Sequence, residues 1–143
     1  LDSAIRYGRK ALAMHPKFTT VYKNMGIIMQ NKYGPDSAEV YWIKFIEYAG
    51  GDPDIPEIKR LLGNGFHKKG IALFREHNNA AAKPYLEKAV QYLPADPGMN
   101  YDLGSLYASE SNWPKARQYW RQGLKAAPGD AMLQQALQQL PSN

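Results

Sequence analysis

The side chains of this sequence that could hold a metal ion or transfer a proton are its histidines and its paired carboxylates. His15 stands just before a proline that ends a helix, and His67 and His77 lie ten residues apart with no carboxylate at metal-ligand spacing. Asp52 and Asp54 fall in a predicted turn, where capping and solvation account for paired acids. The sequence therefore predicts no catalytic residues, no metal site and no cofactor.

Motifs that carry covalent or nucleotide chemistry are missing as well. The sequence has no G-x-S-x-G elbow, no P-loop and no dinucleotide-binding fingerprint. Because it contains no cysteine, it has neither a disulfide framework nor a thiolate metal site. We therefore interpret the protein as a non-enzyme.

Length and composition place the chain among globular proteins. Its 143 residues are 44% hydrophobic and 22% charged, as in typical globular domains. No apolar run approaches the ~20 residues of a membrane span, so we expect a soluble protein, cytoplasmic or periplasmic, with the compartment left open. The chain starts at Leu1 without a methionine, and we expect the natural N-terminus to lie upstream.

The charge balance is moderately basic. The sequence has 18 Lys and Arg against 13 Asp and Glu, a net charge of +5. No basic run is longer than two residues, so the excess fits ordinary solubility charge better than a surface for an acidic partner.

The stretch from residue 97 to 130 predicts two amphipathic helices that pack against each other. Gly104 on the first helix and Ala116 on the second are small, which lets two antiparallel helix axes approach closely. Leu103, Tyr107 and Trp120 lie above and below that crossing, because residues three or four apart share a helix face. We assign these side chains to packing rather than to chemistry.

The ends of the second helix are marked too. Asn112 is its predicted N-cap, with Trp113 and Pro114 in the first turn, where proline is tolerated. Pro128 ends the helix because proline cannot continue it. Together these residues resemble one tetratricopeptide repeat (TPR), a 34-residue helix–turn–helix unit with the signature L-G-x2-Y, A-x3-F and Pro.

The same frame recurs along the chain. One period back, Gly70, Ala82 and Pro94 occupy the positions of the glycine, the alanine and the closing proline. We expect a single all-α domain, and the resemblance implies a right-handed superhelix of antiparallel helix pairs with a C-terminal capping helix. Since the chain begins in mid-repeat, we expect a fragment of a longer array. Its predicted parts are a half repeat at 1–18, repeats at 19–52, 63–96 and 97–130, an insertion at 53–62 and a capping helix at 131–143.

The insertion at 53–62 is the part that such an array does not need. Pro56 and Glu57 mark a helix start, and ten helical residues add roughly 15 Å. The sequence leaves two alternatives, one long helix running to about Glu76 or a separate short helix that breaks at Gly63-Asn64-Gly65. A functional role and a tolerated expansion stay equally open.

The resemblance implies that the first helices of successive repeats line a concave groove that binds a partner protein or peptide. On these helices the sequence offers cations, amides, a ring and aliphatic groups that packing does not need. The predicted partner-binding residues are Lys23, Asn24, Ile27 and Asn31 in the repeat 19–52, Asn64, His67, Lys68, Ile71 and Arg75 in 63–96, and Tyr101, Asp102 and Ser105 in 97–130.

One ligand of the family is not expected. Some TPR proteins hold the C-terminal carboxylate of heat-shock chaperones with a fixed set of Lys, Asn and Arg side chains. Here His67, Ile71 and Asp102 stand where that set requires Lys or Asn.

Other functions stay open beside a protein-binding scaffold. Helical repeats also bind RNA, but base-reading repeats reuse the same positions, whereas Lys23, His67 and Tyr101 differ at one such position. Nucleic acid is therefore the less favoured partner. A non-catalytic arm of a larger enzyme or secretion assembly is a further alternative, and a chain that begins in mid-repeat can also self-associate.

Overall fold

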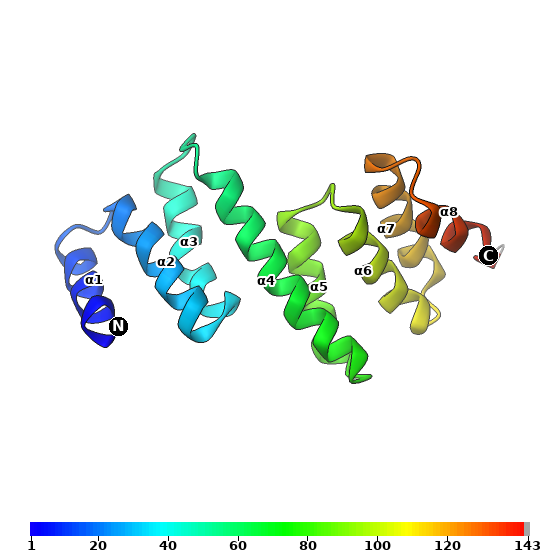
Figure 1. Cartoon of the computed structure of the whole chain (residues 1–143), viewed down its shortest axis with the longest axis horizontal. Helices are drawn as coiled ribbons and strands as arrows, with labels where there is room; N and C mark the ends of the chain where they lie inside the picture. The colour runs from blue at the N-terminus through cyan, green and yellow to red at the C-terminus, as the bar shows by residue number, and fades with distance from the viewer. Residues whose placement is uncertain (142–143) are drawn as a thin grey trace. The chain divides into compact units, whose positions relative to one another are not determined.

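The computed structural model describes residues 1–141, and these residues form eight α-helices and no strand. The predicted all-α class is confirmed. The chain divides into two compact units, Leu1–Leu62 and Gly63–Asn143, and helix α4 runs from the first into the second (Figure 1). The helices are α1 (Asp2–Met14), α2 (Thr19–Tyr33), α3 (Pro35–Tyr48), α4 (Ile55–Arg75), α5 (Asn79–Tyr92), α6 (Pro97–Ser109), α7 (Trp113–Ala126) and α8 (Ala131–Gln138).

The first unit is built on the antiparallel pair α2 and α3 (Figure 1). Its core contains Met25, Trp42 and Phe45, each 2% exposed or less. Gly26 lets the Trp42 ring lie directly on the backbone of α2, since a Cβ at Gly26 would be 2.1 Å from Trp42 Nε1. Trp42 Nε1 also donates a 3.0 Å hydrogen bond to the carbonyl oxygen of Lys23. The indole therefore fixes how α3 sits on α2.

The second unit has the same arrangement between α6 and α7. A Cβ at Gly104 would lie 2.4 Å from Trp120 Nε1, and this nitrogen donates a 3.0 Å hydrogen bond to the carbonyl oxygen of Tyr101. Leu103 and Ala116 are fully buried beside this crossing. The predicted packing of the helix pair is confirmed, and each unit contains one indole held on a glycine.

Side-chain caps set where four of the helices begin. Asn78, Asp96, Asn112 and Asp130 precede α5, α6, α7 and α8, and each side chain accepts a hydrogen bond from the backbone N–H three residues on. Such caps satisfy backbone donors that have no partner inside the helix. The predicted cap at Asn112 is confirmed, and Pro114 lies in the first turn of α7.

Helix α4 decides between the two forms expected for the 53–62 insertion. It is a single helix of 21 residues, so the chain forms the long helix and does not break at Gly63 and Gly65. In the second unit Gly63 instead serves packing, because a Cβ there would lie 2.6 Å from Leu93 Cδ1. The glycine allows α4 to approach the end of α5 closely.

Two polar contacts join α5 to the α6 region. Lys83 Nζ lies 2.7 Å from Glu110 Oε2, and the hydroxyl of Tyr107 donates a 2.5 Å hydrogen bond to Glu87 Oε1. Tyr107 is 8% exposed, and its ring stacks on Tyr119 with the centroids 5.7 Å apart. Burial, followed by the hydrogen bond to Glu87, raises the pKa of the Tyr107 hydroxyl.

This raised pKa predicts a loss of stability at alkaline pH. A tyrosine in an unfolded chain titrates near pH 10, whereas the folded protein favours the neutral phenol of Tyr107. The contribution is complete below about pH 10 and is lost as the pH rises toward the folded-state pKa. Thermal melts between about pH 9 and 11.5 should show a shallower fall for Tyr107→Phe than for the wild type. The exposed-site control Tyr7→Phe should follow the wild type, and equal slopes for all three proteins would refute the assignment.

Candidate partner-binding site

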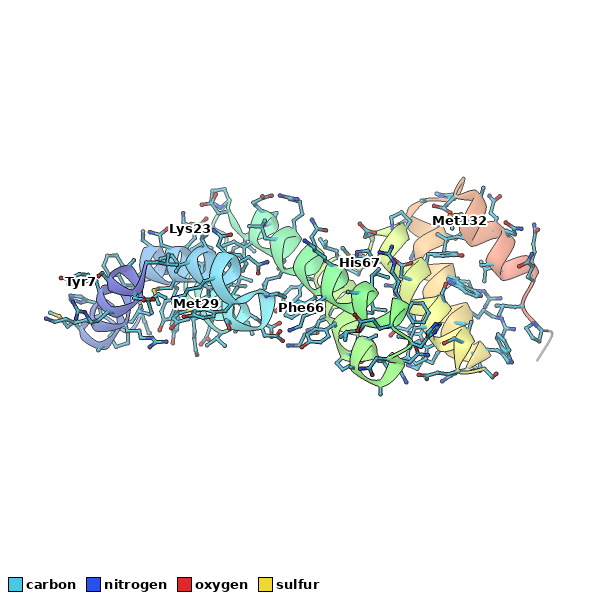
Figure 2. All side chains as sticks on the ribbon, turned by 60° about the horizontal axis from the view of Figure 1, so that its bottom comes forward. Tyr7, Lys23, Met29, Phe66, His67 and Met132 are labelled. Atoms are coloured by element: carbon cyan, nitrogen blue, oxygen red, sulfur yellow. The ribbon has the colours of Figure 1, made fainter. Side chains whose placement is uncertain are left out.

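Four of the predicted residues lie on α2 in the first unit. Lys23, labelled in Figure 2, forms an ion pair with Asp54, with 2.8 Å between Nζ and Oδ2. This hydrogen bond raises the pKa of the Lys23 ammonium. Asn24, Ile27 and Asn31 are exposed. Lys23 is therefore engaged with a carboxylate of the chain itself, and its three neighbours face solvent.

Two predicted residues of the second unit contact each other. His67 Nε2, on α4, lies 2.6 Å from Asp102 Oδ2 on α6, and the side chains are 29% and 27% exposed. Figure 2 labels His67 on α4. This contact joins two neighbouring first helices, so both groups already have a partner within the protein.

The remaining predicted residues of α4 lie beside this contact. Asn64, Lys68 and Arg75 are exposed, and Ile71 is half-buried. Lys68 and Arg75 are seven residues apart, which places them on the same helix face about two turns apart. Within residues 1–141, neither cation forms an ion pair. They are positive charges that a partner can reach.

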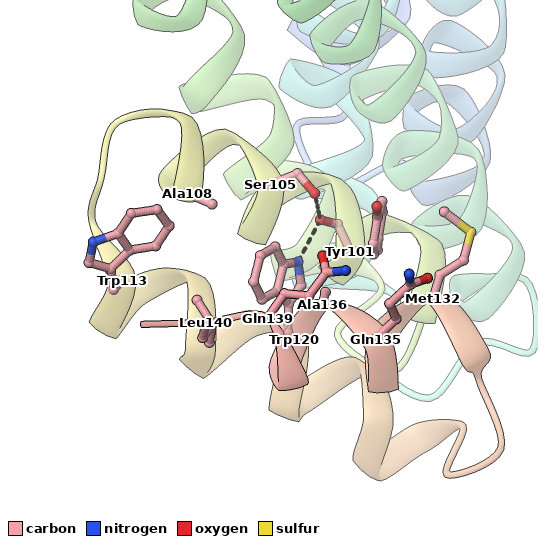
Figure 3. A pocket seen from close by; sticks show the side chains of 10 residues that line it. All are labelled: Tyr101, Ser105, Ala108, Trp113, Trp120, Met132, Gln135, Ala136, Gln139 and Leu140. Carbon is pink, nitrogen blue, oxygen red and sulfur yellow. Dashed lines mark hydrogen bonds between the residues drawn. The ribbon is translucent and has the colours of Figure 1, made fainter. Parts of the chain in front are cut away.

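A pocket of about 440 Å³ opens between α6, α7 and α8 (Figure 3). Tyr101 and Ser105, both predicted, line it from α6. The carbonyl oxygen of Tyr101 accepts hydrogen bonds from Ser105 Oγ at 2.8 Å and from Trp120 Nε1 at 3.0 Å. The Tyr101 and Trp120 rings stack with their centroids 6.3 Å apart. The aromatic part of the pocket is therefore formed by Tyr101 and by Trp120, the indole that packs on Gly104 of α6.

Most of the pocket comes from residues that sequence reasoning did not select. Trp113 begins α7. Met132 and Gln135 lie on α8, and Gln139 is the C-cap that follows it, at intervals of three and four residues. Met132 is 59% exposed. The available signal was this spacing, which places the three side chains on one side of α8 and its C-cap. The sequence had assigned 131–143 only a capping role.

The described residues contain neither a metal-binding cluster nor a membrane-spanning helix. No group of three or more histidine, aspartate or glutamate side chains in residues 1–141 is placed to hold a metal ion. None of the helices in this range is long and apolar enough to cross a lipid bilayer.

The helix pairs, their glycine–indole crossings and the side-chain caps describe a repeat architecture, and a comparison with protein families names it. The family model described as "Tetratricopeptide repeat" matches residues 73–140, which hold most of the second unit. This match identifies residues 73–140 as tetratricopeptide repeat. The resemblance that the 34-residue frame predicted is therefore confirmed. Among curated protein sequences, none matches the chain significantly.

Solved structures of TPR proteins share this fold. The APC/C hetero-tetramer Cut9–Hcn1 is 13% identical over 93% of this chain and 25% of its own, with a TM-score of 0.53. TTC0263, a thermophilic TPR protein of Thermus thermophilus, is 15% identical over 94% and 69%, with a TM-score of 0.50. YrrB, described as a TPR protein with an unusual peptide-binding site, is 16% identical over 91% and 79%, also with a TM-score of 0.50. At these identities the likeness shows the fold alone.

The TPR fold supports a general function. It is the fold of a protein-interaction scaffold, and TPR proteins are in general not catalytic. Such a scaffold takes protein or peptide partners.

Proposed function

We propose that the protein binds an extended segment of a partner protein along the first-helix face of its second unit, and that it does so without catalysis. This face runs from Lys68 and Arg75 on α4, past the His67–Asp102 contact, to the pocket between α6 and α8. The observation that carries the proposal is the pairing pattern on this face. The cations Lys68 and Arg75 have no ion-pair partner and the pocket is open, whereas His67 and Asp102 contact each other.

The order of these features follows from helix geometry. His67 and Asp102 mark the line along which α4 and α6 meet. Lys68 adjoins His67 on α4, Arg75 lies about two turns further along that helix, and Tyr101 adjoins Asp102 on α6. A partner segment that crosses the first helices therefore meets two positive charges at α4 and a neutral aromatic pocket at α6 and α8. We expect it to carry an acidic group toward α4, since Lys and Arg contact carboxylates through charge-assisted hydrogen bonds.

The test is an affinity pull-down from a lysate of the source organism with Lys68→Glu/Arg75→Glu beside the wild type. The double variant should lose a partner that the wild type recovers, because it replaces attraction with like-charge repulsion. Lys115→Glu/Arg121→Glu makes the same change of net charge on two exposed residues of α7 and should retain the partner.

Two results would contradict the proposal. In one, the α4 variant and the α7 control lose binding equally, which would assign the effect to net charge alone. In the other, only nucleic acid is recovered and is released steeply by salt, which would favour the nucleic-acid alternative.

A further inference from the structure

We propose that the pocket between α6, α7 and α8 binds an uncharged, proline-containing segment in the extended polyproline II conformation. The inference rests on the proposed function and states the chemistry that one part of the face selects. It is separable from the role of the α4 cations, because none of its lining residues comes from α4.

Aromatic rings form the apolar surfaces of the pocket. Tyr101, Trp113 and Trp120 line it, with Trp120 only 7% exposed at its floor. Figure 3 shows Trp113 toward one end and Met132 toward the other, with Tyr101 and Trp120 between them. Proline-rich segments dock into aromatic-lined grooves of this kind, since the polyproline II helix is already extended and loses little entropy on binding.

The pocket also presents neutral donors without partners. Within residues 1–141, the indole nitrogen of Trp113 and the side-chain amides of Gln135 and Gln139 make no hydrogen bond. A polyproline II backbone has no internal hydrogen bonds, and proline has no N–H. Such a segment therefore presents free carbonyl acceptors and few donors, which complements amide and indole N–H groups.

The absence of charge in the pocket limits its occupant. No charged side chain is among the lining residues. A carboxylate or ammonium placed there would lose water without gaining an ionic partner, which is costly. The pocket thus selects a neutral stretch, while any acidic group of the partner lies toward Lys68 and Arg75.

The three tryptophans of the chain provide the test. A capped ten-residue polyproline peptide is titrated into the full chain while the three indole N–H signals are followed by NMR. The signals of Trp113 and Trp120 should shift. The signal of Trp42 should not, because this indole is fully buried in the first unit and bonded to the carbonyl of Lys23.

Matched peptides and variants sharpen the result. A capped Gly-Ser peptide of equal length should give no shifts, and a polyproline peptide with alternating glutamates should bind at least roughly tenfold more weakly. Trp113→Ala should weaken polyproline binding roughly tenfold or more, as expected for an aromatic anchor. Gln139→Ala should weaken it less, and Met14→Ala in the first unit should leave it unchanged. Circular dichroism checks that each variant keeps its helix content.

Three outcomes would overturn the inference: no shift with millimolar polyproline, equal shifts with Gly-Ser, or wild-type affinity in both Trp113→Ala and Gln139→Ala. If capture of the partner in the pull-down still required Lys68 and Arg75, the proposed function would hold without the polyproline inference. Conversely, polyproline binding combined with charge-independent capture would uphold the pocket and remove the role of α4.

Discussion

Gly104→Ala is expected to lower the free energy of unfolding by about 2 to 3 kcal/mol, as typical of overpacking at a closely packed crossing. The new Cβ would lie 2.4 Å from Trp120 Nε1 and 2.5 Å from Trp120 Cδ1. The Trp120 indole on α7 cannot rotate away without breaking its hydrogen bond to the carbonyl oxygen of Tyr101, which lies on α6 together with Gly104. The helix preference of alanine over glycine, about 1 kcal/mol, offsets only part of this cost. Urea titration followed by circular dichroism at 222 nm measures the change.

Gly98→Ala is the matched control on the same helix. A Cβ at Gly98 would come no closer than 3.4 Å to Asp96 Oδ1, an ordinary van der Waals contact. This variant should equal the wild type or gain up to about 1 kcal/mol from helix propensity. If Gly104→Ala is as stable as Gly98→Ala, the close approach of α6 and α7 does not limit stability.

The helix pairs were predictable because their cause is local and periodic. Small residues at Gly104 and Ala116 fix where two helices can cross, and large residues three or four positions away fill the space around that crossing. The N-cap at Asn112 follows from the preference of asparagine for a helix start. The hydrogen bond of Trp120 to the Tyr101 carbonyl was not predictable, since residue spacing does not say where an indole N–H points.

The candidate site was predicted only in part because its contacts join distant positions. Lys23 was expected to face a partner, but its ammonium meets Asp54, 31 residues further along the chain. His67 and Asp102 were each selected singly, although they are 35 residues apart and touch. Reasoning on one helix at a time cannot detect such pairs. Lys68, Arg75, Tyr101 and Ser105 stayed available to a partner in the second unit, and all four were in the predicted set.

The pocket was missed for a related reason. One wall of the pocket comes from α8 and its C-cap. Met132 and Gln139 become pocket residues only because this segment lies beside Trp120, the indole that packs on α6.

Asn100 is another residue whose role depends on its surroundings. It is fully buried, and its Nδ2 donates to the carbonyl oxygens of Pro94 at 2.9 Å and Asp96 at 2.8 Å.

These two bonds give Asn100 a role that depends on being a donor. Asn100→Asp keeps the size of the side chain but places a carboxylate against two carbonyl oxygens. A buried charge without a partner costs about 3 to 5 kcal/mol at neutral pH. The folded protein should raise the pKa of the new carboxyl above its unfolded value near 3.9. The penalty should therefore be present at pH 7 and shrink as the pH falls toward 4, where the protonated carboxyl can donate one hydrogen bond.

The measurement is the difference in unfolding free energy between Asn100→Asp and the wild type at pH 7 and at pH 4.5. Asn100→Ala should lose about 1 to 3 kcal/mol at both pH values, because it removes the bonds without adding charge. Asn112→Asp makes the same substitution at an exposed N-cap, where a carboxylate accepts from Lys115 N as the amide does. It should be neutral or stabilising, since the helix N-terminus favours negative charge. A loss for Asn100→Asp that is equal at both pH values would show that the shape of the side chain, and not its two donated hydrogen bonds, holds the start of α6.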